Sequence, residues 1–494
     1  MPCTTLLAGK NATYDGSTFA ARNEDSGSGS FCAKKMTVVL PQDQPRHYRS
    51  VLSHVEMDLP DDPMRYTCMP NAVGNEGIWG AAGVNSANVS MTATETLTTN
   101  ARVLGADPFV VLREAENGRP EQPGGIGEED MVSITLPYIR SAREGVLRLG
   151  SLLEKYGTYE MNGIAFQDAD EVWWLETIGG HHWIARRVPD DCYVVMPNQF
   201  GIDFFDLEDA FGAQKEFLCS TDLREFIRDN FLDLTLNGET FNARLAFGSH
   251  SDADHTYNTP RAWFVQRYFN PAENIWDGPD AEYRPDSDDI SWCRVPEHKI
   301  TVEDVKYVLS SHYQGTPYDP YSKHADPRVK GSLRPIGINR NNFLSLVQIR
   351  PYLPEEIRSI EWVAYGSNAF NAFVPLYGNI SRAPSYFATE GRVTTENFYW
   401  ENRVIAALAD ACFDKCIQYI ERYQMEIAAE GYAVIHAADR RYLAAPDPEN
   451  AQKANEAANA EMEKFLRKET DGLLDRVLSV ASMNMKNAFS REDG

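Results

Sequence analysis

Cys3 is the residue whose type and position best suit covalent chemistry. If Met1 and Pro2 are removed, Cys3 carries a thiol with an ordinary pKa of about 8.5 and a free α-amine with an ordinary pKa of about 7.7–8.0. One residue would then supply both a nucleophile and a general base near neutral pH. The simpler alternative is that Cys3 is a small, buried apolar residue.

A predicted hairpin brings charged residues back beside Cys3. Residues 4–9 are β-prone, residues 11–16 contain an Asp15-Gly16 turn signal, and residues 17–21 return as a strand. The sequence Arg22-Asn23-Glu24-Asp25 follows directly. A nearby arginine favours a thiolate, and a nearby carboxylate could orient the amine.

These residues resemble a known family. Cys3-Thr4-Thr5, Asp15-Gly16-Ser17 and the run from Ala21 to Asp25 are similar to the opening of the cysteine-type N-terminal nucleophile dipeptidases, relatives of choloylglycine hydrolase and penicillin V acylase. The chain length and the stretches 80–85 and 195–198 also fit. The resemblance implies an α+β fold, a four-layer αββα sandwich of two antiparallel sheets. It also implies a leader (1–2) that is removed, a hydrolase domain (3–395) and a helical C-terminal extension (396–494).

The resemblance also implies a set of catalytic residues. With Cys3 as the nucleophile, Arg22 and Asp25 match the family's Arg-x-x-Asp, Asn85 matches an oxyanion-binding asparagine, Asn198 matches an asparagine near the amine, and Arg261 matches a later arginine of the site. Each has a structural alternative. Arg22 and Asp25 could form only a structural ion pair, and Asn85 could be a turn residue. Asn198 could cap the end of a strand, and Arg261 could be a surface arginine.

The function implied is hydrolysis of a broad range of dipeptides, without a metal or other cofactor, by a cytoplasmic homo-oligomer. Two alternatives stay open: an acyl-amide hydrolase of the bile-salt hydrolase or penicillin V acylase type, and an unprocessed homologue that only binds. The net charge of −25 over 494 residues argues against nucleic acid and anionic membranes as partners. Eight dispersed cysteines are too few for a disulfide scaffold and favour a reducing compartment.

Several further elements must position these residues. A strand pair is expected near residues 77–82 and 90–93, and a helix is expected to open at Asp107-Pro108. A second helix is expected over residues 141–156. Four strands of one antiparallel meander are predicted at residues 164–167, 172–178, 182–188 and 192–196. Elaborate loops are expected over residues 235–345. Helices are expected from about residue 402 and over residues 448–482.

Other candidate motifs are weaker. The segment from His250 to His255 only superficially resembles a binuclear metal-hydrolase motif, and we expect an exposed acidic loop there. Cys412 and Cys416 are one helical turn apart on an apolar stripe and are expected in the core. The sequence contains no P-loop, dinucleotide fingerprint or serine nucleophile elbow.

Overall fold

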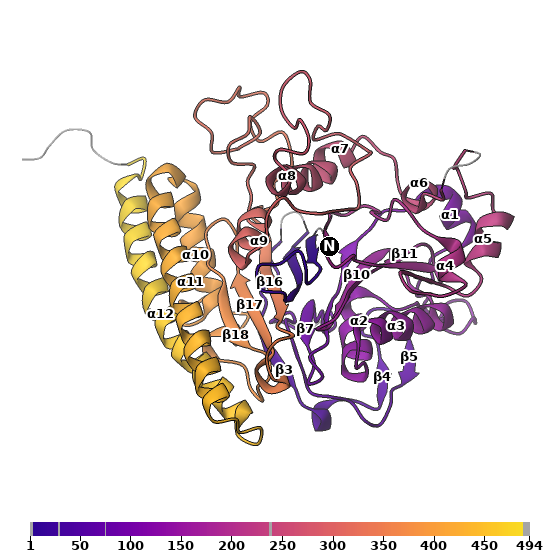
Figure 1. Ribbon diagram of the computed structural model, residues 1–494, viewed down its shortest axis with the longest axis horizontal. Helices are drawn as coiled ribbons and strands as arrows, with labels where there is room; N and C mark the ends of the chain where they lie inside the picture. The colour runs from indigo at the N-terminus through magenta and orange to yellow at the C-terminus, as the bar shows by residue number, and fades with distance from the viewer. Residues whose placement is uncertain (1–2, 28–29, 75, 237–239, 488–494) are drawn as a thin grey trace, which may run out of the picture.

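Two large antiparallel sheets organise the chain in the computed structural model, which describes residues 3–27, 30–74, 76–236 and 240–487 (Figure 1). The expected leader, residues 1–2, lies outside the described residues. The first sheet has the strand order β15-β13-β1-β2-β16-β17-β18. Its strands are β1 (Cys3–Ala8), β2 (Thr18–Asp25), β13 (Tyr193–Met196), β15 (Cys293–Arg294), β16 (Asn341–Ile349), β17 (Ser359–Tyr365) and β18 (Val374–Tyr377).

The predicted N-terminal hairpin is confirmed. β1 and β2 pair antiparallel, with Cys3 opposite Glu24 and Thr5 opposite Arg22. Within the turn, the Asp15 carboxylate accepts hydrogen bonds from the backbone N–H and the hydroxyl of Ser17, at 3.1 and 2.9 Å. Because β13 pairs with the other edge of β1, the strand that begins with Cys3 lies in the interior of its sheet.

The second sheet has the order β14-β12-β11-β10-β8-β7, with β9 also paired to β10. The expected pairing near residues 77–93 is confirmed, although its first strand starts later than expected. The strands are β7 (Ala82–Val84), β8 (Ser90–Thr92), β9 (Glu95–Thr96), β10 (Asn162–Gln167), β11 (Val172–Thr177), β12 (Trp183–Arg187) and β14 (Phe217–Cys219).

The prediction of a four-stranded meander is wrong for its last strand. β10, β11 and β12 are neighbours in the second sheet, but β13 crosses to the first sheet and pairs with β1. The turn before β13 packs on the end of β1, where the Gly9 N–H donates to the Cys192 carbonyl at 3.0 Å and the Asn11 N–H donates to the Asp190 carbonyl at 2.7 Å. This crossover brings residues that follow β13 to the start of β1.

Helices cover the outer faces of the sheets, and short ribbons complete the fold (Figure 1). The helices are α1 (Ala101–Ala106), α2 (Glu128–Thr135), α3 (Ala142–Tyr156), α4 (Leu207–Ala210), α5 (Leu223–Asp229), α6 (Ala243–Phe247), α7 (Asp254–Tyr257), α8 (Thr259–Phe269), α9 (Val302–Leu309), α10 (Phe398–Asp410), α11 (Phe413–Ala444) and α12 (Ala451–Met483). The short helical turns are η1 (Pro41–Asp43), η2 (Leu136–Tyr138), η3 (Glu355–Ile357) and η4 (Ser385–Phe387), and the ribbons pair β3 (Thr37–Val39) with β6 (Tyr66–Cys68) and β4 (His47–Arg49) with β5 (Glu56–Asp58).

Three of the apolar cores among the described residues join the sheets to each other and to helices. Leu7 and Ala20 of the first sheet pack with Ala165 and Trp174 of the second sheet, so the inner faces of the two sheets share one core. A second core joins α3 to the outer face of the second sheet. A third joins α8, α9 and part of α11 to the outer face of the first sheet. Burial of apolar surface on both faces of each sheet is the main source of stability for such layers.

The helix predicted over residues 141–156 is confirmed as α3, whose cap Ser141 accepts the Glu144 N–H at 3.1 Å. The helix expected to open at Asp107 is absent from this described stretch, because Asp107 instead ends α1. Its carboxylate accepts the backbone N–H groups of His181 and His182 at 2.7 and 3.1 Å. Asp107 therefore ties α1 to the turn between β11 and β12.

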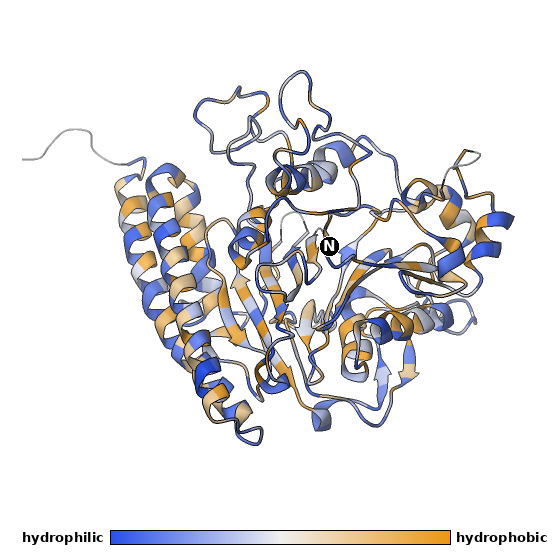
Figure 2. Cartoon of the chain, in the orientation of Figure 1, coloured by the Kyte–Doolittle hydropathy of each residue, from blue (hydrophilic) through white to orange (hydrophobic). Residues whose placement is uncertain are grey.

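The C-terminal helices are confirmed, with a break at residues 411–412 between α10 and α11. They pack beside β17 and β18, and Figure 2 shows apolar and polar residues alternating along them. At Gly431 of α11, an added Cβ would lie 2.7 Å from a side-chain carbon of Pro375 in β18, so this glycine permits the close approach of helix and sheet. None of the described helices combines the length and apolarity needed to cross a membrane.

Candidate active site

The thiol of Cys3 lies among buried charges. Cys3 and Arg22 are both fully buried, and Arg22 Nη2 lies 3.0 Å from Cys3 Sγ. The same guanidinium contacts Glu24 at 3.1 Å and Glu128 at 2.8 Å, and the ammonium of Lys34 contacts Glu24 at 2.7 Å. Around the sulfur, the attraction between neighbouring cations and carboxylates thus offsets the free-energy cost of burying their charges.

Burial dominates the electrostatics of the thiol. It raises the pKa of Cys3 to about 12, against the opposing effect of the Arg22 guanidinium. Burial also disfavours the charged form of Arg22, yet Cys3, Glu128 and Glu24 hold the pKa of Arg22 above its usual value. The thiol therefore keeps its proton at neutral pH and needs a base before it can act as a nucleophile.

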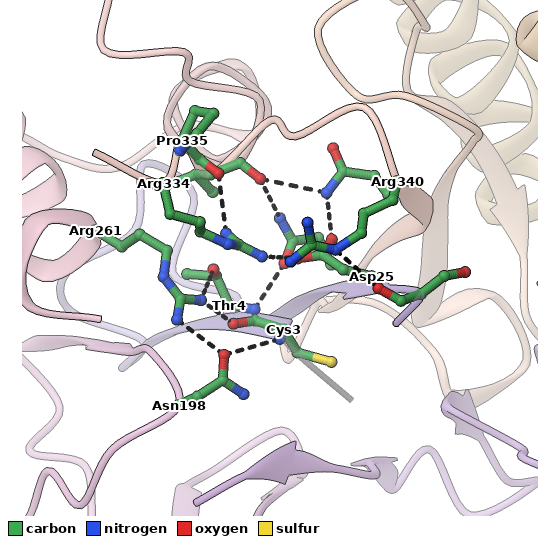
Figure 3. Close-up of polar contacts among 12 residues, drawn as sticks. Cys3, Thr4, Asp25, Asn198, Arg261, Arg334, Pro335 and Arg340 are labelled. Atoms are coloured by element: carbon green, nitrogen blue, oxygen red, sulfur yellow. Dashed lines mark hydrogen bonds and ion pairs between the residues drawn. The ribbon is translucent and has the colours of Figure 1, made fainter. Parts of the chain in front are cut away.

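A second set of contacts holds the main chain of Cys3 (Figure 3). The Cys3 N–H donates to Asn198 Oδ1 at 3.2 Å, and the Cys3 carbonyl accepts from Arg261 Nη1. Arg261, which is fully buried, also donates to Asn198 Oδ1 at 2.8 Å, to Asn258 Oδ1 at 2.6 Å and to Thr4 Oγ1 at 2.8 Å. The structure thus brings Asn198 and Arg261 together at Cys3, and the alternative that Arg261 is a surface arginine is excluded.

Asp25 lies on the other face of β2 from Arg22. In a strand, residues three apart point to opposite faces, so the Arg22–Asp25 pair considered from the sequence does not form. The Asp25 carboxylate instead accepts from Arg334 and from Asn341 Nδ2 (Figure 3). Within the described chain, no hydrogen bond joins Asp25 to Cys3. Any effect of Asp25 on the nucleophile is therefore indirect.

Asn85 is a turn residue, and the oxyanion role expected for it is not supported. Its Nδ2 donates to the carbonyls of Leu136 and Ile139 at 2.8 and 2.7 Å, and its Oδ1 accepts from Ala87 and Val89 at 2.9 and 3.1 Å. Both amide hydrogens are thus engaged in holding the β7–β8 turn on η2. No donor of this side chain is free to bind a tetrahedral intermediate.

Two buried carboxylates complete the site and were not identified from the sequence. Glu128 begins α2, and its Oε1 accepts both Arg22 Nη2 and the Thr94 N–H, the latter at 3.1 Å. Glu95 of β9 is fully buried and accepts from the Thr5 hydroxyl at 2.9 Å. Burial raises the pKa of Glu95 to about 8, against Arg261 and Arg22. In the sequence, Glu95 can be singled out only as the one charged residue of the run 90–96.

The weaker motifs are structural. His250 is exposed, while the Asp254 carboxylate accepts from Ser249 and Ser251 at 3.0 Å each. Among the residues that the structure describes, no group of three or more His, Cys, Asp or Glu is arranged to hold a metal ion. Cys412 and Cys416 are buried, as expected, and their sulfur atoms lie 3.5 Å apart.

Comparison with known proteins identifies the family of this chain. Residues 2–426 match Peptidase family C69. A dipeptidase of Bifidobacterium longum (strain NCC 2705) is 55% identical over all of both chains. Dipeptidase A of Lactobacillus helveticus is 42% identical over 96% of each chain, and a probable dipeptidase A of Streptococcus pyogenes serotype M1 is 54% identical over 99% of this chain and 98% of its own. The family predicted from the opening residues is confirmed, and the chain belongs to Peptidase family C69.

Proposed function

We propose that this chain is a cysteine dipeptidase that hydrolyses a broad range of dipeptides through Cys3 as its N-terminal nucleophile. The observation that carries the proposal is the position of Cys3 at the head of an interior strand, with its sulfur 3.0 Å from Arg22 and its nitrogen 3.2 Å from Asn198. The names of the relatives, which are dipeptidases or probable dipeptidases, support the substrate class.

The proposed reaction starts after Met1 and Pro2 are removed. The freed α-amine of Cys3 takes the thiol proton, and the sulfur attacks the carbonyl carbon of the dipeptide bond. The protonated amine then gives its proton to the departing amino group, so the C–N bond breaks and a thioester remains. Water, deprotonated by the same amine, attacks the thioester and releases the first amino acid and the thiol.

The contacts on Cys3 suit this cycle. Arg22 stabilises the thiolate that forms once the amine has taken the proton. Asn198 and Arg261 fix the direction of the nitrogen and the carbonyl of Cys3. The positive charge of Arg261 also disfavours an ammonium beside it, which keeps the amine available as a base. While residue 2 is still attached, the nitrogen of Cys3 is an amide and offers no such base.

The proposal extends to the organisation of the chain. The order of helices, sheet, sheet and helices supports a four-layer αββα sandwich of the N-terminal nucleophile hydrolases, with residues 3–395 as the hydrolase domain and 396–494 as the helical extension. The family match runs on to residue 426, within α11. We further propose a cytoplasmic homo-oligomer without a cofactor. The eight cysteines are all free thiols, which supports a reducing compartment.

The first residue of the active enzyme tests the proposal. Intact-mass measurement and N-terminal sequencing should show a chain that starts at Cys3. Cys3→Ala should keep the leader, fold normally and lose at least about 10⁴-fold in kcat, whereas Cys3→Ser retains slow processing at most. A fully active enzyme that keeps Met1 and Pro2, or substantial turnover by Cys3→Ala, would overturn it.

A further inference from the structure

A dipeptidase has to recognise the free α-ammonium of its substrate, and the reaction fixes where that group lies. In a dipeptide, a single Cα separates the ammonium nitrogen from the carbonyl carbon that is attacked, a span of about 2.5 Å. In a near-attack arrangement the sulfur lies about 3–3.5 Å from that carbon. A carboxylate that binds the ammonium must therefore lie within about 6–8 Å of the sulfur, since a charge-assisted hydrogen bond adds about 2.8 Å.

Glu128 meets this distance condition. Arg22 Nη2 lies 3.0 Å from Cys3 Sγ and 2.8 Å from Glu128 Oε1, so the sulfur and the carboxylate oxygen are no more than about 6 Å apart. Glu128 is 1% exposed, and its carboxylate is oriented by the Thr94 N–H as well as by Arg22. Its position relative to the nucleophile is thus fixed by contacts with two other segments of the chain.

The surroundings of Glu128 carry an excess of carboxyl groups. The Glu128 N–H donates to Glu160 Oε1 at 2.8 Å, and burial together with the Glu128 charge raises the pKa of Glu160 to about 7. Next in the chain, burial and the neighbouring Asp130 raise the pKa of Glu129 to about 7. On the Cys3 side, Glu95 Oε1 is buried and has no hydrogen-bond partner in the described part of the chain. A cationic group of a ligand would lower the electrostatic energy of this region.

Of the carboxyl groups near Cys3, Glu128 is the one suited to an ammonium. Although burial opposes ionisation, the positive charge of the chain's N-terminal amine, followed by the Arg22 guanidinium and the Thr94 N–H, holds the pKa of Glu128 below its usual value, which favours the carboxylate form. Glu95 is mostly protonated at neutral pH, because burial raises its pKa to about 8. Glu24 already contacts two cations, Arg22 and Lys34.

We infer that the Glu128 carboxylate binds the substrate α-ammonium and thereby places the first carbonyl of the dipeptide at Cys3 Sγ. This inference rests on the proposed function and deepens it. It explains in physical terms why cleavage would follow the first residue only: a longer distance between ammonium and scissile carbonyl does not fit between Glu128 and the sulfur. A substrate with a blocked amino group offers no cation to the carboxylate and therefore forgoes a charge-assisted hydrogen bond.

The test compares alanyl-alanine with N-acetyl-alanyl-alanine. The wild type should prefer the free dipeptide strongly. Glu128→Gln should lower kcat/KM for the free dipeptide about 50-fold and change the N-acetyl substrate less than about 3-fold, so that the preference collapses. Glu24→Gln is the matched control, because Glu24 contacts the same guanidinium through Nη1. It should lower kcat/KM for both substrates by the same factor.

An equal loss on both substrates in Glu128→Gln would overturn the inference, since Glu128 would then act only through Arg22. If that variant does not fold, the wild type decides: alanine should inhibit at least about tenfold more strongly than propanoate, and equal inhibition would overturn the inference. A wild type that cleaves N-acetyl-alanyl-alanine as fast as alanyl-alanine also overturns it. A wild type that cleaves no dipeptide overturns the proposed function itself.

Discussion

Cys3 joins two regions that differ in the way they handle charge. Around the sulfur, Arg22 is neutralised by Glu24 and Glu128, so each buried charge has an opposite neighbour. Around the main chain, Asn198 and Arg261 contact the nitrogen and the carbonyl, and no described carboxylate is bonded to the nitrogen. In the first region, Arg22 favours a negative sulfur against the larger effect of burial, whereas the second region resists a positive nitrogen. Proton transfer from the thiol to the amine is therefore unfavourable at rest, and attack on the substrate, which consumes the thiolate, drives it forward.

The largest effect is expected at the sulfur. Arg22→Met removes the cation beside the thiolate and leaves Glu24 and Glu128 without their shared partner, so kcat/KM should fall about 10²–10³-fold. Alkylation of Cys3 by iodoacetamide in the mature protein should slow in parallel, because the thiolate is the reactive form. Circular dichroism controls for folding. An unchanged alkylation rate in a folded variant would show that Arg22 does not stabilise the thiolate.

A smaller effect, of a different kind, is expected at the nitrogen. Asn198→Asp places a carboxylate where the amide oxygen now accepts from Cys3, and a negative charge there favours the ammonium form of the amine. The pKa of the base should rise, so the acidic limb of the kcat/KM profile should move upward by about one pH unit. Activity at pH 7 falls about tenfold, while activity on the alkaline side is retained. A uniform loss at every pH would show that Asn198 only positions Cys3.

The smallest catalytic effect is expected at Asn85, outside both regions. Asn85→Ala leaves the carbonyls of Leu136 and Ile139 without their donors, so the free energy of unfolding should fall by about 1–3 kcal/mol. The kcat of the folded enzyme should change less than about threefold, since no donor to the reaction is lost. Urea denaturation and steady-state kinetics measure the two quantities. A loss of 100-fold in kcat with unchanged stability would restore an oxyanion role.

The part of the site that the sequence reveals is the part built by short connections. The Asp15-Gly16 turn fixes the register of the first hairpin, and that register alone places Arg22 and Glu24 beside Cys3. The contacts of Asp25 and Asn85 cannot be predicted from the motif, because a motif gives spacing but not the face of a strand or the partners of a side chain. Glu128 and Glu95 come from a helix and a strand about 90–125 positions away, and only the packing of the second sheet on the first brings them to the sulfur.

The interior position of β1 bears on how this protein can be handled in the laboratory. Any peptide joined ahead of Cys3 has to start from a fully buried residue that pairs with Glu24 of β2 and lies two positions before the first β1–β13 pair, Thr5 with Met196. An affinity tag that stays attached at that end would keep the nitrogen of Cys3 as an amide, which cannot act as the base. Production vectors should therefore carry the tag after residue 494 or encode a protease site whose cut leaves cysteine first.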